Sequence, residues 1–432
     1  MILRRLSHSL RALGFAALAL GLGLGFSSLA SAAQAVPADA AREVLVLLRL
    51  PAEHFHPGGY SDSYGDGAAA AARRRVAQRI AAAHGLKLVT NWPIPLVGVD
   101  CFVMTVPADQ SPEQVAEILT HDPDVAGAEP MHTYRAQAST LPPGAGSREA
   151  GRGQTAEVTH NDPLYLAQPA AREWRLAELH AVATGRGVKV AVIDSMVDAS
   201  QPDLAGQIQT IQDFVLDHPH APEQHGTGVA GIIAGIADNH IGIAGVAPHA
   251  RLMALRACWQ EGAATAVCDS LSLAKALYFA IGHNAQVINL SLSGPPDPLL
   301  GRLIDVALAR GMVVVAAVDP HAPEGGFPAS HAGVVAVSDD PATTAPGALV
   351  APGRDAPTTE PGGRFALVSG SSYAAAHVSG LFALMREHNG RAAGPVALVT
   401  FRPGGGPIDT CASLMHAACP RLAGAPPTVA RE

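Results

Sequence analysis

Three short segments contain the side chains that a nucleophilic hydrolase needs. Asp194 ends an apolar run, His225 begins the small-residue segment HGTGVAG, and Ser372 begins a similar segment, SYAAAHV. A serine hydroxyl attacks a carbonyl carbon when a neighbouring base takes its proton, and that base needs an acidic group to orient it. The residue types therefore predict that Asp194, His225 and Ser372 act together on an acyl substrate.

Each of these residues alone has an ordinary structural explanation. An Asp after a strand often caps a helix, a single His is usually a surface residue, and Ser pairs are common in loops. The combination is more specific, because each residue lies at a predicted strand end or helix start. Folds of the α/β class place their sites at the carboxyl ends of strands, and helix N-termini leave N–H donors free for a developing oxyanion.

The elements that would position these residues alternate between strands and helices over residues 161–400. Continuous apolar runs are typical of strands buried on both faces, and their alternation with helices predicts a parallel sheet flanked by helices. The predicted strands are Gly187–Ile193, Leu252–Ala257, Val287–Leu292, Met312–Ala317 and Val334–Val337. The predicted helices are Gly226–Gly235, Ser270–His283 and Pro298–Arg310.

Residues 43–136 form a separate pattern that predicts a small α+β, ferredoxin-like unit. A capping box at Ser111 starts one of its helices, with Pro112 at the first helical position. Its predicted strands are Glu43–Leu50, Gly98–Val106 and Val125–Glu129, and its other helix is Ala68–His84. Residues 137–160 are rich in Gly, Ser, Thr and Pro, which predicts a linker, and residues 401–432 are expected to be an irregular tail.

The first 32 residues have the pattern of a secretory signal peptide. Arg4, Arg5 and Arg11 precede an apolar stretch, Leu13–Leu29, and a small-residue cleavage pattern, Ala30–Ala32. A membrane anchor is the alternative, but the stretch is shorter than a spanning helix and no second one follows. We therefore expect a secreted or periplasmic protein without a membrane span after signal removal. A net charge of −8 gives no indication of a nucleic-acid partner.

Five cysteines fit an oxidising compartment. Cys258 and Cys268 are close in sequence, as are Cys411 and Cys419, so we predict two local disulfides. Cys101 is left over in the N-terminal unit. No Cys or His cluster has zinc-like spacing, and we assign no metal ligands on that basis.

The three segments resemble the Asp, His and Ser motifs of the subtilisin-like (S8-type) serine peptidases. The resemblance runs from Asn161 to Gly380 and includes GIAGVAP at 242–248, VINLSLSG at 287–294, FPAS at 327–330 and APG at 351–353. Residues 43–136 resemble the inhibitory propeptide of that family. The resemblance implies an exported serine endopeptidase that works through an acyl-enzyme intermediate and processes its own precursor.

The resemblance also implies a role for each residue. Asp194 would orient the imidazole, His225 would take the proton, and Ser372 would attack the peptide carbonyl. One segment would pair with the substrate backbone and form a wall of the specificity pocket: Ser291, Leu292, Ser293 and Gly294. The oxyanion would be held by the Ser372 N–H and by the residue at position 319.

Seven positions depart from the family pattern, among them Met196 for a Gly, Ser371 for a Thr and Ala376 for a Pro. Asp319 stands where the family has an Asn that donates to the oxyanion, and Val318 replaces a Gly and would narrow the pocket. Gly228 replaces a second His, and Tyr373 replaces a Met. These changes leave the three predicted catalytic residues in place, but Asp319 favours a slow enzyme.

The implied partners are polypeptide substrates and the protein's own propeptide, and the chemistry requires no cofactor. The resemblance raises calcium binding near Asp203 and the loop Ala237–His240. The main alternative is a non-catalytic relative that binds peptides in the same groove. The signal, propeptide and complete set of Asp194, His225 and Ser372 favour the enzyme. An esterase of the α/β-hydrolase class would have Gly-x-Ser-x-Gly with its Ser before the other two residues.

Overall fold

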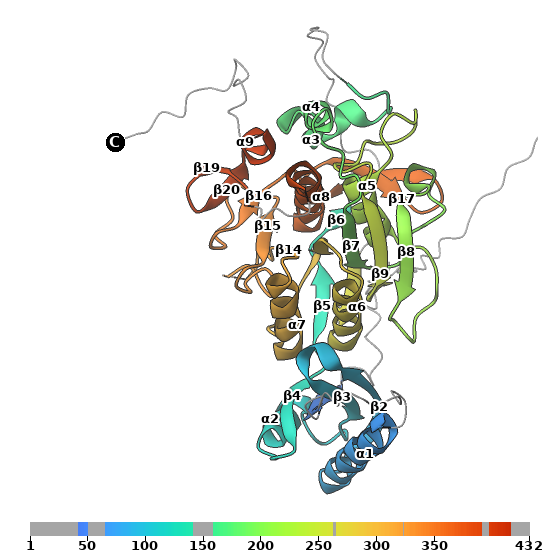
Figure 1. Cartoon of the computed structure of the whole chain (residues 1–432), viewed down its shortest axis with the longest axis vertical. Coiled ribbons are helices and arrows are strands. Elements are labelled where there is room, and N and C mark those ends of the chain that lie inside the picture. Colours follow the sequence, from blue (N-terminus) through green and yellow to red (C-terminus); the bar gives the residue numbers. More distant parts are fainter. Residues whose placement is uncertain are drawn as a thin grey trace, which may run out of the picture. The chain divides into compact units, whose positions relative to one another are not determined.

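In the computed structural model, the part of the chain from residue 189 onward is built around a nine-stranded sheet (Figure 1). The strand order of this sheet is β19-β20-β16-β15-β14-β12-β7-β9-β8. Neighbouring strands are parallel except β19 and β20. The structure describes residues 42–50, 65–140, 159–261, 265–322, 324–390 and 397–415. The predicted signal peptide lies outside these ranges. The strands are β7 (Lys189–Asp194), β8 (Ile208–Asp213), β9 (Arg251–Arg256), β12 (Val287–Leu290), β14 (Val313–Ala317), β15 (Val335–Ser338), β16 (Leu349–Val350), β19 (Thr400–Arg402) and β20 (Gly405–Ile408).

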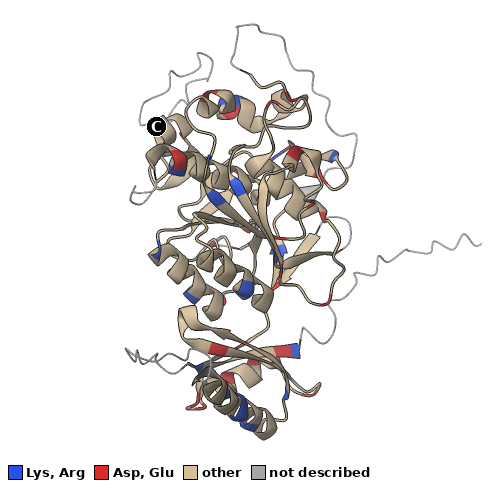
Figure 2. Cartoon of the chain, turned by 45° about the vertical axis from the view of Figure 1, so that its right-hand side comes forward, with Lys and Arg blue, Asp and Glu red and all other residues tan. Residues whose placement is uncertain are grey.

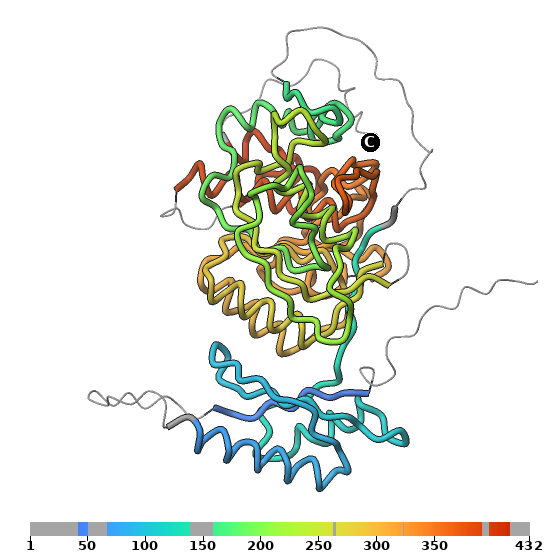
Figure 3. The backbone as a smooth tube through the Cα atoms, turned by 90° about the vertical axis from the view of Figure 1, so that its right-hand side faces the viewer, coloured from blue at the N-terminus to red at the C-terminus, as the bar shows by residue number. Residues whose placement is uncertain are grey.

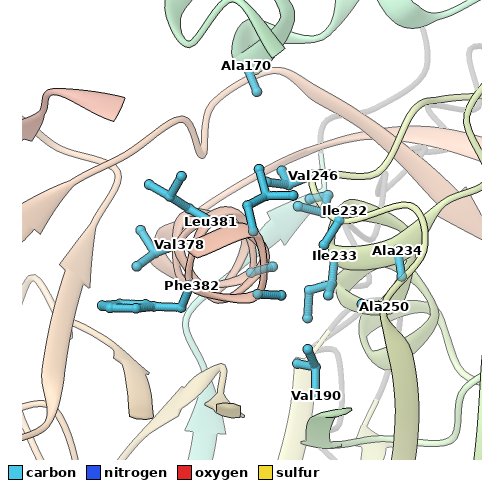
Figure 4. Close-up of a cluster of buried hydrophobic side chains, with 14 of the residues drawn as sticks. Ala170, Val190, Ile232, Ile233, Ala234, Val246, Ala250, Val378, Leu381 and Phe382 are labelled. Carbon is cyan, nitrogen blue, oxygen red and sulfur yellow. The ribbon is translucent and has the colours of Figure 1, made fainter. Parts of the chain in front are cut away.

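Helices cover both faces of this sheet, as the apolar runs predicted. Along β7, Val190 and Val192 join one core cluster, whereas Ala191 and Ile193 join another, because successive strand side chains point to opposite faces. The first cluster contains α5 (Gln224–Ala234) and α8 (Ser371–Asn389), and part of it is drawn in Figure 4. The second contains α6 (Ser270–Gly282) and α7 (Pro298–Ala309). Two short helices, α3 (Pro169–Glu173) and α4 (Leu176–His180), precede β7.

The N-terminal unit, Glu43–Pro130, has the predicted ferredoxin-like order β2-β3-β1-β4 and a core of its own. Ser111 caps its second helix by accepting the Gln114 N–H. Its elements are β1 (Glu43–Arg49), α1 (Gly65–Ala83), β2 (Lys87–Ile94), β3 (Val99–Thr105), α2 (Pro112–Thr120) and β4 (Val125–Pro130). The sequence analysis missed β2 because this edge strand is largely exposed and carries a proline. In Figure 2 the ribbon of α1 is marked by a run of basic residues.

After β4 the chain contributes strands to two smaller sheets. Strand β5 (Thr133–Ala136) lies between β11 (Thr265–Asp269) and β13 (Leu292–Ser293), with β10 (Cys258–Glu261) beyond β11. Strand β6 (Ser139–Thr140) pairs with β18 (Arg364–Ser369), which pairs with β17 (Ala356–Glu360). Figure 3 allows this segment to be followed as a tube. The start of the expected linker is therefore paired in strands, and residues 141–158 lie outside the described ranges.

The expectation of an irregular tail is wrong over the described residues. Strand β20 pairs in parallel with β16, β19 pairs with β20, and α9 (Thr410–Met415) follows. The sequence analysis did not predict this strand pair, because glycines interrupt the apolar pattern by which strands are predicted. Gly404 and Gly405 have φ values of 83° and 137°, which favour glycine.

The structure confirms the disulfide between Cys258 and Cys268, which are opposed on β10 and β11. Cys101 is a free thiol in β3, and burial raises its pKa. Cys419 lies outside the described residues, so its pairing with Cys411 stays a prediction.

Replacing Cys258 and Cys268 together by Ser should lower the free energy of unfolding by about 2–3 kcal/mol, because the bridge closes a short loop of the unfolded chain. Denaturant unfolding should be measured on protein that also carries Ser372→Ala, to prevent degradation. Cys101→Ser is the matched control for loss of a thiol that forms no bridge. An unchanged unfolding midpoint in the double variant would contradict a stabilising role for the bridge.

Candidate active site

Asp194 and His225 form a buried pair at the carboxyl edge of the large sheet. Asp194 ends β7, and its Oδ1 lies 2.7 Å from Nδ1 of His225, the second residue of α5. Asp194 Oδ1 also accepts the Ser195 N–H at 2.6 Å, and Gly226 N–H donates to Ser195 Oγ at 3.0 Å. Because Nδ1 donates to the carboxylate, the lone pair of Nε2 is available for a proton. Nε2 has no hydrogen-bond partner among the described residues.

Charged residues connect the elements that carry Asp194 and His225, and the sequence analysis missed these residues. Glu223, which precedes α5, accepts the N–H of Met196 at 2.8 Å and that of Gln260 at 3.1 Å. Arg256 is buried at the end of β9 and contacts Glu223 at 3.4 Å and Asp213 at 3.0 Å. One carboxylate thus ties the loop after Asp194 to the helix that carries His225. Only the assembled fold reveals these contacts, because the residues are far apart in sequence.

Ser372 is the second residue of α8 and is fully buried. Its Oγ donates to the Ser291 carbonyl at 2.8 Å, and Ser291 Oγ donates to the Ser372 carbonyl at 2.8 Å. Asn289 Nδ2 donates to Ser291 Oγ at 2.9 Å, and Ser379 Oγ donates to Asn289 Oδ1 at 2.8 Å. This network fixes the start of α8 against the end of β12.

The chain itself lies against Ser372 as an extended peptide. The Ser372 N–H donates to the Gln137 carbonyl at 3.1 Å, and the Gln137 N–H donates to Ser372 Oγ at 3.0 Å. On the N-terminal side of Gln137, Arg135 and Ala136 pair with Ser293 and Leu292. The predicted substrate-binding segment Ser291–Gly294 therefore holds a strand in this structure, and that strand belongs to the same chain.

Asp319 and Val318 follow β14. Asp319 Oδ1 accepts the His321 N–H at 2.8 Å, so the carboxylate caps the turn that contains Pro320. Val318 is buried within the core cluster of α6 and α7. The oxyanion role of Asp319 and the pocket role of Val318 stay predictions.

One group of acidic and imidazole side chains is close enough to hold a metal ion: His160, Asp162 and Asp238. Both carboxylates already accept backbone N–H groups, and an imidazole is not a ligand that calcium favours. Asp203, where we expected calcium, accepts from Asn239 and from the Ile243 N–H, and burial raises its pKa to about 6. Asp238 belongs to the loop Ala237–His240, so a group that could hold a metal ion includes this loop. Its imidazole and hydrogen bonds fit calcium poorly, and calcium binding near Asp203 and this loop stays a prediction.

The Gly228 and Tyr373 departures compensate for each other. A Cβ on Gly228 would lie 3.4 Å from Tyr373 Cε1 and 3.0 Å from Thr358 Cγ2. The Tyr373 ring is buried, with its centroid 5.6 Å from that of His225. Tyr373, which is larger than the usual Met, therefore lies beside position 228, where the family usually has a His side chain.

Comparisons with known proteins identify the family of this chain. A sequence model of the subtilase family matches residues 185–400. The chain is 35% identical to an intracellular serine protease of Paenibacillus polymyxa, over 47% of this chain and 68% of the relative. It is 33% identical to thermitase of Thermoactinomyces vulgaris, over 54% of this chain and 88% of thermitase. The chain belongs to the subtilase family.

This subtilase is a subtilisin-like serine endopeptidase, so its substrates are polypeptides. It is also 32% identical to subtilisin E of Bacillus subtilis, over 63% of this chain and 68% of subtilisin E. Fervidolysin of Fervidobacterium pennivorans is a solved structure with a similar fold, at a TM-score of 0.62 and 21% identity. That match covers 88% of this chain and 61% of fervidolysin. Within the described ranges, no helix is long and apolar enough to cross a membrane.

Gly228→His should destabilise this subtilase, because the new side chain must displace Tyr373 or Thr358. Tyr373→Met alone should also destabilise it by removing a buried ring. The double variant should lose less unfolding free energy than the two single variants lose together. The difference, measured in a double-mutant cycle, should be about 1–3 kcal/mol. Unfolding free energies measured in the Ser372→Ala background would test this, with Gly228→Ala as the control for a small side chain. Losses that simply add would contradict the compensation.

Proposed function

We propose that this protein is an exported subtilase made as a self-processing precursor, with Asp194, His225 and Ser372 as its catalytic triad. We further propose that it cleaves its own Gln137–Ala138 bond. The supporting observation is the Gln137 carbonyl, which accepts the Ser372 N–H at the start of α8. Strands β5 and β6 hold the chain on either side of this bond, as a peptide substrate would be held.

The chemistry follows from the atoms around Ser372. Its hydroxyl turns from the Ser291 carbonyl to Nε2 of His225, which takes the proton while Oγ bonds to the Gln137 carbonyl carbon. Asp194 stabilises the imidazolium, and the Ser372 N–H donates to the developing oxyanion. The imidazolium then gives the proton to the Ala138 nitrogen, and the C–N bond breaks. Water, activated by His225, hydrolyses the acyl-enzyme.

The N-terminal unit would act as an inhibitory propeptide after cleavage. Strand β5 remains in the groove between β11 and β13, so other peptides are excluded from the same hydrogen bonds. The unit makes further contacts with the helices behind the groove. Trp92 lies edge-on to Tyr278 of α6 at 5.2 Å, and Arg302 of α7 donates to the Val97 carbonyl.

Export rests on the predicted signal at residues 1–32 and on the disulfide, which is typical of oxidising compartments. One similar protein is named as intracellular, so similarity alone does not assign a compartment. The alternative, a peptide-binding protein without catalysis, draws on Asp319, which offers no donor to an oxyanion when it is ionised. Processing of the precursor separates the two candidates.

Precursor carrying Ser372→Ala should keep its Gln137–Ala138 bond, whereas wild-type protein should yield a chain that begins at Ala138. Ser371→Ala, which removes the adjacent hydroxyl, is the matched control and should still mature. Intact mass and N-terminal sequencing after cell-free synthesis without proteases give the result. Maturation of the Ser372→Ala precursor would contradict self-processing. A wild-type N-terminus elsewhere would contradict only the assigned bond.

Asp319→Asn should increase kcat by up to about 10²-fold. An ionised carboxylate has no donor for the oxyanion, whereas an amide has one, and a single such donor contributes roughly 10²–10³ in kcat. The amide oxygen can still accept the His321 N–H. Asp319→Ala is the control, because it loses the turn contact without supplying a donor. If the Asn variant is no faster than wild type at any pH, Asp319 does not face the oxyanion.

Release of the propeptide should become faster as the pH rises from 5 to 8. Glu129 on β4 is buried and its oxygens lack hydrogen-bond partners of normal geometry within the described residues. Burial and the nearby Asp297 raise its pKa above the ordinary value of 4.5. The complex thus holds a proton that free propeptide loses above about pH 4.5, so binding weakens by up to about tenfold per pH unit.

The release rate is read from the growth of peptidase activity in the cleaved complex. Glu129→Gln should flatten the pH dependence, since the amide holds no titrating proton. His132→Gln is the control for the imidazole that contacts Asp297. An equal pH dependence in wild type and Glu129→Gln would show that another group sets it.

A further inference from the structure

The side chain of Tyr134 occupies a closed pocket beside the groove. Tyr134 is the fourth residue on the N-terminal side of the proposed scissile bond, counting Gln137 as the first, and it has no exposed surface. Its ring lies 6.3 Å from that of Phe327, and a Cβ on Gly294 would come within 2.4 Å of Tyr134 Cδ1. The absence of a side chain at Gly294 therefore makes room for an aromatic ring.

The base of this pocket is polar. The Tyr134 hydroxyl lies 3.3 Å from Asp297 Oδ2 and 3.2 Å from the Pro295 carbonyl. The Asp297 side chain is fully buried, and its Oδ2 also accepts the Ser270 hydroxyl at 2.6 Å. Its Oδ1 accepts the Leu300 N–H at 2.9 Å and so caps α7. A buried carboxylate needs such donors, because leaving its oxygens unpaired away from water is costly.

Three of the groups around Asp297 would leave with the propeptide, and Tyr134 is one of them. Glu129 and His132 belong to the N-terminal segment, whereas Ser270 and Leu300 belong to the peptidase domain. In the mature enzyme, Asp297 would keep its contacts with Ser270 and Leu300. It then has capacity for a further donor at the side where the Tyr134 hydroxyl now lies.

We propose that Asp297 makes this subtilase select tyrosine over phenylalanine at the fourth residue before the cleaved bond. This inference rests on the proposed function and names the substrate class of the same site. A phenylalanine ring fits the same walls but brings no hydroxyl, so the pocket loses the hydrogen bond whose single proton is shared between Asp297 Oδ2 and the Pro295 carbonyl. Burial, followed by the charge of Asp297, raises the pKa of the Tyr134 hydroxyl, which therefore stays a donor at the working pH.

The expected discrimination is about 10- to 100-fold in kcat/KM, as for one hydrogen bond to a charged group. Larger ratios require a site whose polar groups are left entirely unpaired, and Ser270 and Leu300 prevent that here. The neighbouring position should discriminate little. Arg135 is largely exposed and lies 3.9 Å from Glu261, and exposed ion pairs contribute little.

The test uses mature wild-type enzyme and fluorogenic peptides that carry Tyr-Arg-Ala-Gln before the cleaved bond. Replacing the Tyr by Phe should lower kcat/KM about 10- to 100-fold, whereas replacing the Arg by Ala should change it less than about threefold. Asp297→Ser keeps a helix-capping hydroxyl but does not reach the tyrosine. Asp297→Ser should lose most of the preference for Tyr, so that kcat/KM for the Tyr and Phe peptides differs by less than about threefold.

Equal kcat/KM for the Tyr and Phe peptides would overturn the selectivity while leaving the proposed peptidase intact. A preference for Tyr that persists in Asp297→Ser would overturn the role of Asp297. If the variant does not fold, the wild-type comparison of the two peptides still decides whether the hydroxyl is recognised. Failure to cleave any of the peptides, together with a precursor that does not mature, would overturn the proposed function and the selectivity with it.

Discussion

The site depends on the close approach of two helix starts to the carboxyl edge of a parallel sheet. Small residues permit this approach in α5 and α8. A Cβ on Gly226 would lie 2.2 Å from the Ser195 carbonyl oxygen, and one on Gly380 would lie 2.6 Å from Val246 Cβ. A larger side chain at Gly226 would push α5 away from the loop after β7, and one at Gly380 would push α8 away from the loop that contains Val246. His225 can therefore contact Asp194 because the start of α5 is built from residues that leave the backbone accessible.

The close approach of these helices to the sheet buries polar groups, and nearly all of the buried polar groups that the structure describes have hydrogen-bond partners. Glu223 is paired with backbone N–H groups and with Arg256, and Asn289 links two serines. Removing one member of such a set is costlier than its net stabilisation suggests, because the remaining partners stay buried. His225 Nε2 is an exception among the described residues, and it is the atom that must take a proton in the proposed reaction.

The parallel sheet and its helices could be predicted because their signals are local. Apolar runs marked β7, β9, β12, β14 and β15, and three short motifs marked the proposed triad. Strands β5 and β6 could not be predicted in the same way, since they are strands only because a groove elsewhere in the chain supplies their partners. The same reason explains why Glu223 and Asp297 were missed. Their importance lies in contacts with distant residues, and a single Glu or Asp has no local pattern.

The central claim is that Asp194, His225 and Ser372 form a working nucleophile. Its most direct test is the rate at which mature protein reacts with a serine-directed fluorophosphonate, compared with a His225→Ala variant matured in trans by the wild-type enzyme. We expect one label per chain, at Ser372, and a reaction at least about 10³-fold slower in His225→Ala. Equal rates in the two proteins, or no labelling of the wild type, would contradict the account.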